Sequence, residues 1–280
     1  MTPKKIQSII KKFTINRKTS VPILENCAVV DNNIIATDME KFICLDANWI
    51  EPWVYVSIEH NIKTKDSIHE FAKVPKTDWD LIATISQEDY KKLCDDVKYM
   101  KNIVKKKNYN AILTGIYFRW DCIIGTDTMC LYKKYTVKFK KDFILPIDNI
   151  DALLVRENTW NVCVYSLWDV IFFSTEYWYT WSVTIKWKYP NIEDDRIMPI
   201  TYDEENIKIN LSKEIEICKA LKMDYIHINK WVMNEAHKTD HDDIEIRLSY
   251  AKLMNGYTFN KKWDIYISRD VEWWTLVIRG

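Results

Sequence analysis

Tryptophan occupies the places in this chain where antiparallel strands need a tight turn. Each of these tryptophans lies beside an apolar, alternating stretch and next to an acidic residue. Turns between strands often need a residue with positive φ, which favours glycine because glycine has no Cβ, and an indole gains nothing there. The pattern occurs at Asp78-Trp79-Asp80, Arg119-Trp120-Asp121, Leu167-Trp168-Asp169, Lys262-Trp263-Asp264 and Glu272-Trp273-Trp274.

The glycine content agrees with this pattern. The chain has 4 glycines and 13 tryptophans, whereas the average usage of about 7% predicts roughly 20 glycines at this length. Our hypothesis is that the gene reads the codon UGA as glycine and that the printed sequence translates UGA as tryptophan. The alternative is a chain that is truly rich in tryptophan and uses exposed indoles to bind a partner.

Charge and cysteine content narrow the class of protein. The chain has 40 basic and 40 acidic residues, so nucleic-acid binding requires local clustering of charge. No apolar run approaches the length of a membrane-spanning helix, and the N-terminus lacks the apolar region of a signal peptide. The seven cysteines include no C-x-x-C pair. We therefore expect a cytoplasmic protein with reduced thiols and no membrane partner.

The order of apolar residues predicts a chain that is mostly strand, with a few short helices. β-Branched and aromatic residues predict strands at 28–30, 33–37, 54–58, 112–118, 122–125 and 162–167. Helical spacing of apolar residues predicts helices at 6–13, 88–101, 148–155, 212–222 and 249–257. Ser86 and Asp89 form a capping box before the second helix.

A unit of one strand, one helix and several strands recurs along the chain. Copies run over 81–135 and 143–188, and a third begins at Ile207. An acidic segment without strand character, 191–200, lies between Pro190 and Pro199 and is interpreted as an interdomain linker.

The sequence contains no motif that indicates a catalytic site, so we expect no enzyme activity and no cofactor. It has no P-loop, nucleophile elbow, G-x-G-x-x-G or H-E-x-x-H motif. His237 and His241 lie beside carboxylates and could bind a metal if they were helical, but their polar surroundings favour an exposed loop. The Thr37-Asp38 and Thr126-Asp127 pairs end strands at equivalent places, and we interpret them as turn-forming residues.

Several motifs resemble the β subunit of bacterial DNA polymerase III, the bacterial sliding clamp. The segments Thr114-Gly115-Ile116-Tyr117-Phe118 and Gly125-Thr126-Asp127-Thr128-Met129-Cys130-Leu131 are similar to the family's L-x-G-(V/M)-x-F and A-T-D-G-H-R-L. Arg17-Lys18-Thr19-Ser20-Val21-Pro22-Ile23-Leu24 and Ala36-Thr37-Asp38-Met39-Glu40 are similar to R-x-T-L-P-I-L and A-T-D-L-E. Phe143-Ile144-Leu145-Pro146 resembles a central-domain strand, and Trp187-Lys188-Tyr189-Pro190 resembles G-(K/R)-(F/Y)-P. Weaker likeness to the third domain lies at 246–250 and 276–279.

The resemblance implies an α+β DNA clamp, the processivity fold, in which repeated modules form a ring with sheets outside and helices lining the hole. The domains implied are a shortened first domain at 1–80, the best-matching second domain at 81–200 and a shortened third domain at 201–280. Thr128-Met129-Cys130 replaces the family's Gly-His-Arg. These departures suggest a divergent, phage-encoded clamp. The ring is expected to be a homo-oligomer, with a dimer favoured and a trimer as the alternative.

For a clamp, the DNA-facing residues should be lysines and arginines on the helices, because phosphate contacts of this kind are independent of sequence and sensitive to salt. The alternative for each residue is an ordinary solvated helix face. The candidates are Lys4, Lys5, Lys11, Lys12, Arg17, Lys18, Lys98, Lys101, Lys105, Lys106, Lys107, Lys219 and Lys222.

The resemblance also implies a hydrophobic pocket that receives short peptide motifs of the polymerase, the clamp loader and repair proteins. Its residues would be Leu113, Thr126, Leu131, Pro199, Tyr250, Leu276, Val277 and Ile278. The alternative is that these apolar residues belong to the ordinary core.

Taken together, the motifs predict a non-catalytic sliding clamp that encircles duplex DNA, without sequence specificity, and tethers the replicative polymerase during DNA replication. The alternative function is a phage structural or ligand-binding β-rich protein with a tryptophan-rich surface.

Overall fold

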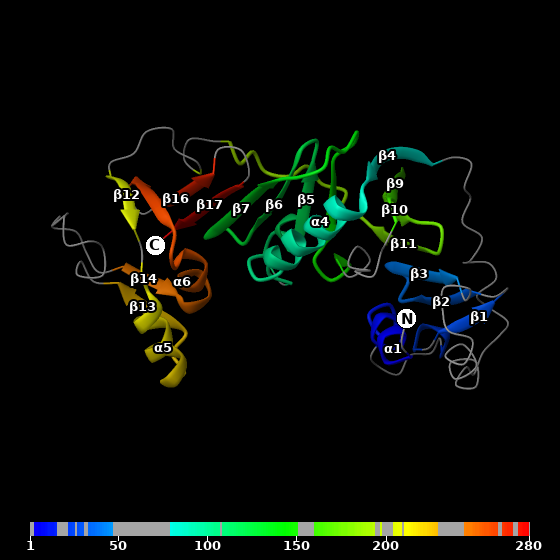
Figure 1. Cartoon of the computed structure of the whole chain (residues 1–280), viewed down its shortest axis with the longest axis horizontal. Coiled ribbons are helices and arrows are strands. Elements are labelled where there is room, and N and C mark those ends of the chain that lie inside the picture. The colour runs from blue at the N-terminus through cyan, green and yellow to red at the C-terminus, as the bar shows by residue number, and fades with distance from the viewer. Residues whose placement is uncertain are drawn as a thin grey trace. The chain divides into compact units, whose positions relative to one another are not determined.

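The computed structural model of the chain divides into two compact units, and Figure 1 shows its helices and strands. The residues that the structure describes are 3–15, 22–25, 27–30, 33–46, 79–106, 108–150, 160–193, 197, 204–208, 210–228, 244–262, 265–270 and 274–279. Unit 1 comprises Met1–Lys98, Gly115–Cys122 and Thr136–Trp187, and unit 2 comprises Tyr99–Thr114, Ile123–Tyr135 and Lys188–Gly280.

Unit 1 is built around seven strands in the order β1-β2-β3-β11-β10-β9-β4, and every described pair in this sheet is antiparallel. The strands are β1 (Ala28–Val30), β2 (Asn33–Thr37), β3 (Lys41–Asp46), β4 (Asp80–Ile85), β9 (Val162–Leu167), β10 (Val170–Ser174) and β11 (Trp178–Val183). The unit also contains the antiparallel pair β5 (Gly115–Arg119) and β8 (Phe143–Pro146). Its helices are α1 (Pro3–Ile10) and α4 (Gln87–Met100), whose last two residues belong to unit 2.

The sheet of unit 1 follows from alternation of apolar and polar residues. In β9, Val162, Val164 and Ser166 are buried while the residues that alternate with them are half-buried, as expected for a strand with one face in the core. Helix α4 places Tyr90 against the ring of Trp178 on β11, with ring centroids 6.1 Å apart. The buried side of α4 therefore packs on a strand of this sheet.

The expected capping box starts α4. Ser86 Oγ donates to Asp89 Oδ2 at 2.8 Å, and the Asp89 amide donates to Ser86 Oγ at 3.2 Å. These bonds satisfy a backbone N–H that has no partner inside the helix, which is why the helix begins here.

Unit 2 contains strands in the order β12-β15-β16-β17-β7-β6. They are β6 (Cys122–Thr126), β7 (Cys130–Tyr135), β12 (Glu204–Lys208), β15 (Thr258–Lys262), β16 (Ile265–Asp270) and β17 (Trp274–Arg279). The unit also has the hairpin of β13 (Tyr225–Ile228) and β14 (Ile244–Arg247), and the helices α5 (Ser212–Ala220) and α6 (Leu248–Met254).

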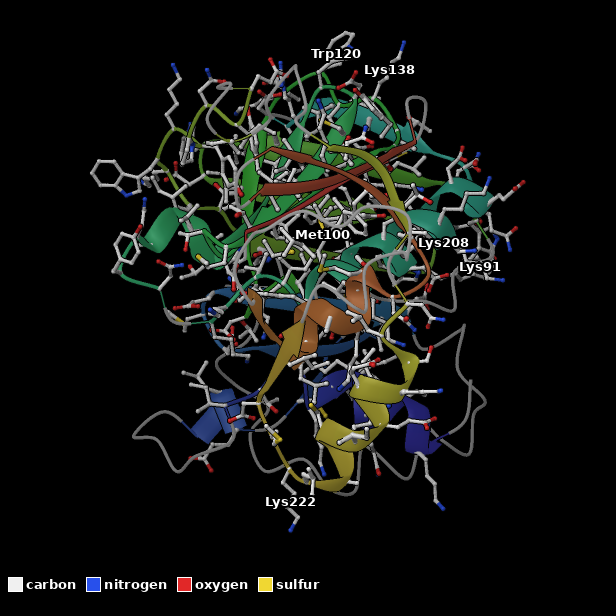
Figure 2. All side chains as sticks on the ribbon, turned by 90° about the vertical axis from the view of Figure 1, so that its left-hand side faces the viewer. Lys91, Met100, Trp120, Lys138, Lys208 and Lys222 are labelled. Carbon is white, nitrogen blue, oxygen red and sulfur yellow. The ribbon has the colours of Figure 1, made fainter. Side chains whose placement is uncertain are left out.

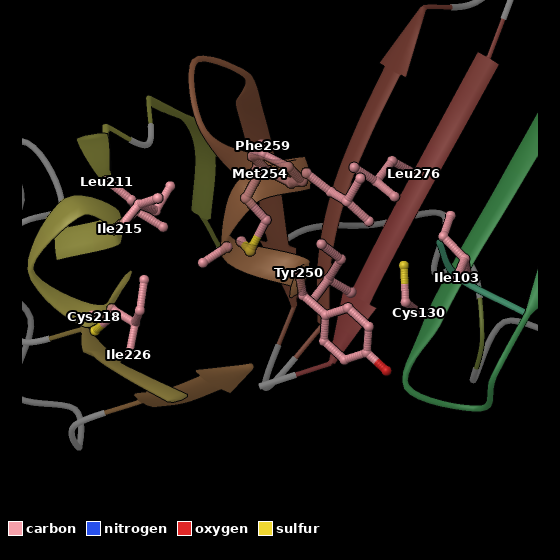
Figure 3. Packing of buried hydrophobic residues seen from close by; sticks show 13 residues of the cluster. Ile103, Cys130, Leu211, Ile215, Cys218, Ile226, Tyr250, Met254, Phe259 and Leu276 are labelled. Atoms are coloured by element: carbon pink, nitrogen blue, oxygen red, sulfur yellow. The ribbon is translucent and has the colours of Figure 1, made fainter. Parts of the chain in front are cut away.

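A single hydrophobic cluster joins the helices of unit 2 to its sheet. Figure 3 shows side chains of α5, α6 and β17 pointing toward one another, among them Ile215, Tyr250, Met254 and Leu276. Burial of large apolar side chains stabilises a fold by roughly 1.5–3 kcal/mol each. The cluster is therefore what fixes α5 and α6 on this side of the sheet.

Most predicted elements are confirmed, with small shifts of their ends. Strands at 28–30, 33–37 and 162–167 agree with β1, β2 and β9, and the strand predicted at 122–125 is β6. The strand predicted at 112–118 begins later, at Gly115, because Ala111–Thr114 forms a 3₁₀ turn. The helices predicted at 6–13, 88–101, 212–222 and 249–257 are α1, α4, α5 and α6. The strand at 54–58 and most of the helix at 148–155 lie outside the described residues.

The long-range pairing was not visible in the sequence. Strand β3 pairs with β11, so one sheet joins strands from the predicted first and second domains. The division into domains at 1–80, 81–200 and 201–280 remains a prediction. Residues 191–193 of the predicted linker belong to unit 2, where Ile192 is buried and Glu193 Oε1 lies 3.7 Å from Lys133 Nζ.

No helix in the described part of the chain is long and apolar enough to span a membrane. All seven cysteines are free thiols.

The glycines on the described strands lie where the backbone has no room for a side chain. A Cβ at Gly115 would lie 2.6 Å from Ile144 Cγ2, and one at Gly125 would lie 3.0 Å from Val104 Cγ2. At Gly256 the backbone conformation, and not space, favours glycine. This residue follows α6 with a φ of +87°, and the space around it is open.

We expect Gly115→Ala to lower the free energy of unfolding by about 1–3 kcal/mol, because the added methyl group overlaps Ile144 and forces the β5–β8 pair to move. Chemical denaturation measures this loss. Gly256→Ala is the matched control: it adds the same methyl group without a clash, so only the positive φ opposes it. A Gly115→Ala protein as stable as the parent would contradict the close packing.

Candidate functional site

The candidate DNA-facing residues on helices lie on the faces that the core does not use. In α4, Leu93 and Val97 are buried and Lys98 is exposed. In α5, Ile215 and Cys218 are buried and Lys219 is exposed. Each helix therefore presents lysine to solvent beside its apolar stripe, as an amphipathic helix does.

The remaining candidates fall into three groups. Lys4, Lys11, Lys12, Lys106 and Lys222 are exposed, and Figure 2 shows Lys222 pointing outward from the end of α5. Lys101 and Lys105 are half-buried. Arg17, Lys18 and Lys107, and the side chain of Lys5, lie outside what the structure describes.

Lys105 binds a buried carboxylate within the protein. Its Nζ lies 2.9 Å from Asp127 Oδ2, and the same oxygen accepts a hydrogen bond from the Tyr250 hydroxyl. The other oxygen, Oδ1, accepts from the amides of Met129 and Cys130 at 3.2 and 3.0 Å. Asp127, at 3% exposure, thus joins three segments of unit 2: the turn between β6 and β7, the segment after α4, and α6.

These partners decide the ionisation of Asp127. Burial raises the pKa of its carboxyl group, but the hydrogen bonds from Lys105, Tyr250 and the Cys130 amide, with the positive charge of Lys105, outweigh burial. The pKa of Asp127 is therefore held below its ordinary value. The group is ionised at neutral pH and binds the lysine as a salt bridge.

The turn that contains Asp127 repeats in unit 1, in agreement with the interpretation of the two Thr-Asp pairs as turn-forming. Thr126 Oγ1 donates to Cys130 O at 2.8 Å, and Thr37 Oγ1 donates to Lys41 O at the same distance. Asp38 Oδ1 accepts from the Glu40 and Lys41 amides, as Asp127 does from its own turn. The difference is that Asp127 also holds Lys105 and Tyr250.

The candidate peptide-pocket residues are buried, and they lie on both faces of the sheet of unit 2. Leu131 and Val277 are directly opposite each other on β7 and β17. Neighbouring residues along a strand point to opposite faces, and Leu276 and Ile278 belong to the cluster under α6 that contains Tyr250. Leu131 and Val277 therefore share the other face. Leu113 and Thr126 are also buried, and Pro199 lies outside the described residues.

Exposed apolar residues at the end of α5 were not among the predicted site residues. Ile217 is 56% exposed, Leu221 is 65% exposed and Met223 is 40% exposed. Ile217 and Leu221 are four residues apart and thus neighbours on one helix face. The sequence could have revealed these exposed residues, because they are apolar residues that lie off the Ile215–Cys218 stripe.

No group of three or more histidine, cysteine, aspartate or glutamate side chains in the described ranges is placed to hold a metal ion. The segment with His237 and His241 lies outside those ranges.

Comparison with known proteins identifies the fold. No family model and no curated protein sequence matches the chain. Among solved structures, the Helicobacter pylori β clamp bound to a DNA ligase peptide matches with a TM-score of 0.68 and 13% identity, over 99% of this chain and 96% of the clamp. The Bartonella birtlesii sliding clamp, DNA polymerase III subunit β bound to griselimycin, matches with a TM-score of 0.69 and 13% identity, over 100% of this chain and 98% of the clamp. The Bacillus subtilis DNA polymerase sliding clamp matches with a TM-score of 0.65 and 13% identity, over 100% of this chain and 98% of the clamp. The chain thus has the α+β fold of bacterial sliding clamps, as the sequence motifs predicted.

We expect Asp127→Asn to lower the free energy of unfolding by about 1–3 kcal/mol at pH 7, since it removes the charge that holds Lys105 while the Lys105 side chain remains 41% exposed. Because the folded-state pKa of Asp127 is depressed, this stabilisation is fully present above the ordinary aspartate pKa of about 4 and is lost as pH falls through the lower folded value.

Chemical denaturation of the parent protein and of Asp127→Asn between pH 3 and 7 tests this pH dependence. Hydrogen exchange of the α6 amides measures the local effect. The stability difference should be constant above about pH 4 and shrink below it. Asp38→Asn is the matched control, because it alters the same turn without a partner from α6. Equal effects of the two substitutions on α6 exchange would contradict the proposed link.

Proposed function

We propose that this protein is a DNA sliding clamp: a ring that encircles duplex DNA and tethers a replicative polymerase, with no catalytic chemistry. The observation that carries the proposal is the clamp fold along nearly the whole chain and nearly the whole of each matched structure. Sequence motifs of the same family, found independently of the fold, support it. The protein would act in the cytoplasm, where the replication machinery of bacteria and their phages works.

Exposed lysines support non-specific DNA binding. Lys98 on α4, and Lys219 and Lys222 at the end of α5, lie on solvated faces, where an ammonium group can approach a phosphate while remaining hydrated. We propose that these residues face DNA. Lys105 is a weaker candidate than its neighbours because its charge is already matched by Asp127.

A ring needs an interface between copies of the chain, and the apolar end of α5 is the candidate. Ile217, Leu221 and Met223 expose apolar surface that a second copy would bury. We propose that a homo-oligomer, with a dimer favoured over a trimer, closes through this surface, and that the partner surface belongs to a second copy of this chain.

The peptide site is proposed on the side of β7 and β17 that faces away from α6. Leu131 and Val277 form a directly opposed apolar pair there, and both are buried. The Helicobacter pylori clamp was solved with a DNA ligase peptide, which supports short peptides of polymerase, clamp loader and repair proteins as partners. The set of contacting residues remains the one predicted from the motifs.

The alternative function, a β-rich protein that binds a ligand through tryptophan, is favoured by exposed indoles. Trp120, Trp168 and Trp187 are 55%, 86% and 70% exposed. A monomer that binds a peptide or glycan tightly and is not retained on DNA would favour this function.

Topological retention tests the clamp proposal without knowledge of the loader. A linear duplex is attached to a bead at one end, incubated with protein, capped at the free end with streptavidin and washed at 1 M salt. Because high salt weakens phosphate contacts but cannot open a closed ring, we expect retention on capped DNA and loss from uncapped DNA. Equal loss from both would refute the clamp.

Leu221→Asp tests the proposed ring interface in the same assay. A carboxylate in a buried apolar interface is strongly unfavourable, so we expect the variant to sediment as a monomer and to be lost from capped DNA. Tyr109→Asp is the control, since Tyr109 is 92% exposed outside α5. If Leu221→Asp leaves the oligomer unchanged, the ring closes elsewhere.

The lysines are tested by the salt dependence of binding to duplex DNA. Each lysine that contacts a phosphate contributes about 0.9 to the slope of log K against log [salt]. We expect Ala at Lys98 and Lys219 to reduce the slope by up to about 1.8 together. Lys138→Ala, at an exposed position outside the helices (Figure 2), should not change it. An unchanged slope in the double variant would place the DNA on another face.

A further inference from the structure

We infer that the tryptophans in the tight hairpin loops of this chain are glycines in the protein that its own host synthesises. The inference rests on the backbone geometry of the loops and does not depend on the proposed clamp function. It assigns those positions to the codon UGA, which specifies termination, tryptophan or glycine in different genetic codes.

The loops share one length and one sequence. Leu167 pairs with Val170, and Lys262 pairs with Ile265, so each of these hairpins closes with two residues. A third two-residue connection joins the end of β5 to the start of β6. The connecting pairs are Trp168-Asp169, Trp263-Asp264 and Trp120-Asp121.

Two-residue hairpin loops restrict the backbone conformation of their first residue. Their favoured turns are types I′ and II′, whose twist matches that of the strands, and type II′ takes glycine at its first central position. Gly-Asp is a typical sequence for such a loop. Tryptophan thus stands at the first position of each Trp-Asp loop. Of the two such loops that the structure describes, Trp168 has a positive φ and Trp120 does not.

Trp168 shows the requirement directly in the backbone. Its φ is +47°, whereas Asp169 is not among the residues with positive φ, and a type II′ turn needs positive φ at this first loop position. The left-handed region is unfavourable for a side chain with a Cβ and open to glycine. The Trp168 side chain is 86% exposed, so packing of the indole does not compensate for the strain.

The other hairpin turns with positive φ differ in a way that supports this interpretation. Met39 and Thr128 also have positive φ, but there the preceding Thr-Asp pair binds the turn amides with its side chains. Side-chain hydrogen bonds of this kind stabilise turns that a residue other than glycine must adopt. The Trp-Asp sequence begins with a residue that cannot accept such a bond.

Tryptophans in the interior differ from those in the loops. The indole Nε1 atoms of Trp79 and Trp178 are buried without a hydrogen-bond partner, although a buried tryptophan N–H usually finds an acceptor. Both rings are nevertheless packed, since Trp178 is 1% exposed and lies against Tyr90, and Trp79 lies against Phe172. Glycine at Trp178 would leave a cavity in the core, so the inference is confined to the loop positions.

The inference has a consequence for function. Trp120, Trp168 and Trp187 account for the exposed indoles that favour a ligand-binding surface. Trp187 lies outside the hairpin loops. With glycine in the loops, the native protein lacks two of the three exposed indoles that support the alternative function, while the clamp fold is unaffected.

Reading the gene is the first test. We expect UGA at codons 120 and 168, and we expect peptides of the protein isolated from its host to have the mass of glycine at both positions. The codon UGG at either position, or peptides with the mass of tryptophan, would overturn the inference.

Two substitutions in the printed chain test the backbone argument separately. Trp168→Gly should raise the melting temperature by about 2–6 °C, because it relieves the left-handed strain. Trp168→Ala removes the indole but keeps a Cβ, so it should not give this gain. An equal gain from both variants would mean that loss of the exposed indole, and not backbone strain, is responsible. That outcome would contradict the argument, and so would the absence of any gain from Trp168→Gly.

Discussion

Every described strand pair in this molecule is antiparallel, so its sheets depend on closing short hairpins with the correct twist. Where the connection has two residues, the backbone must turn through a conformation that few side chains tolerate. The Thr-Asp turns meet this requirement with side-chain hydrogen bonds, as at Asp38 and Asp127. In the Trp168-Asp169 loop the first residue has no side-chain oxygen to accept such a bond, and Trp168 adopts a positive φ with its indole in solvent. Turn closure is thus the constraint that connects the composition of the chain to its architecture.

Local periodicity predicted the elements well. The alternation in 162–167 and the apolar spacing in 88–101 depend on near neighbours, and both correspond closely to β9 and α4. The Ser86–Asp89 capping box is a three-residue signal, and its hydrogen bonds are present. These features were predictable because their stabilising interactions lie within a few residues along the chain.

The parts that the sequence did not reveal depend on distant contacts. Tyr250 was assigned to a peptide pocket from a motif, but its hydroxyl binds Asp127, 123 residues away. Lys105 looked like one of a run of DNA-facing lysines, and its charge is used inside unit 2. Likewise, alternation shows that Leu276 and Val277 point to opposite faces, but which face α6 covers is decided by packing.

The hairpin loops also bear on where a gene for this chain can be expressed. If UGA encodes their glycines, a cell that reads this codon as termination stops at the first such codon, and a cell that reads it as tryptophan makes a strained protein. Turn geometry would then act as a barrier to exchange of the gene between lineages with different codes, because a recipient cell would make a truncated or weakened chain.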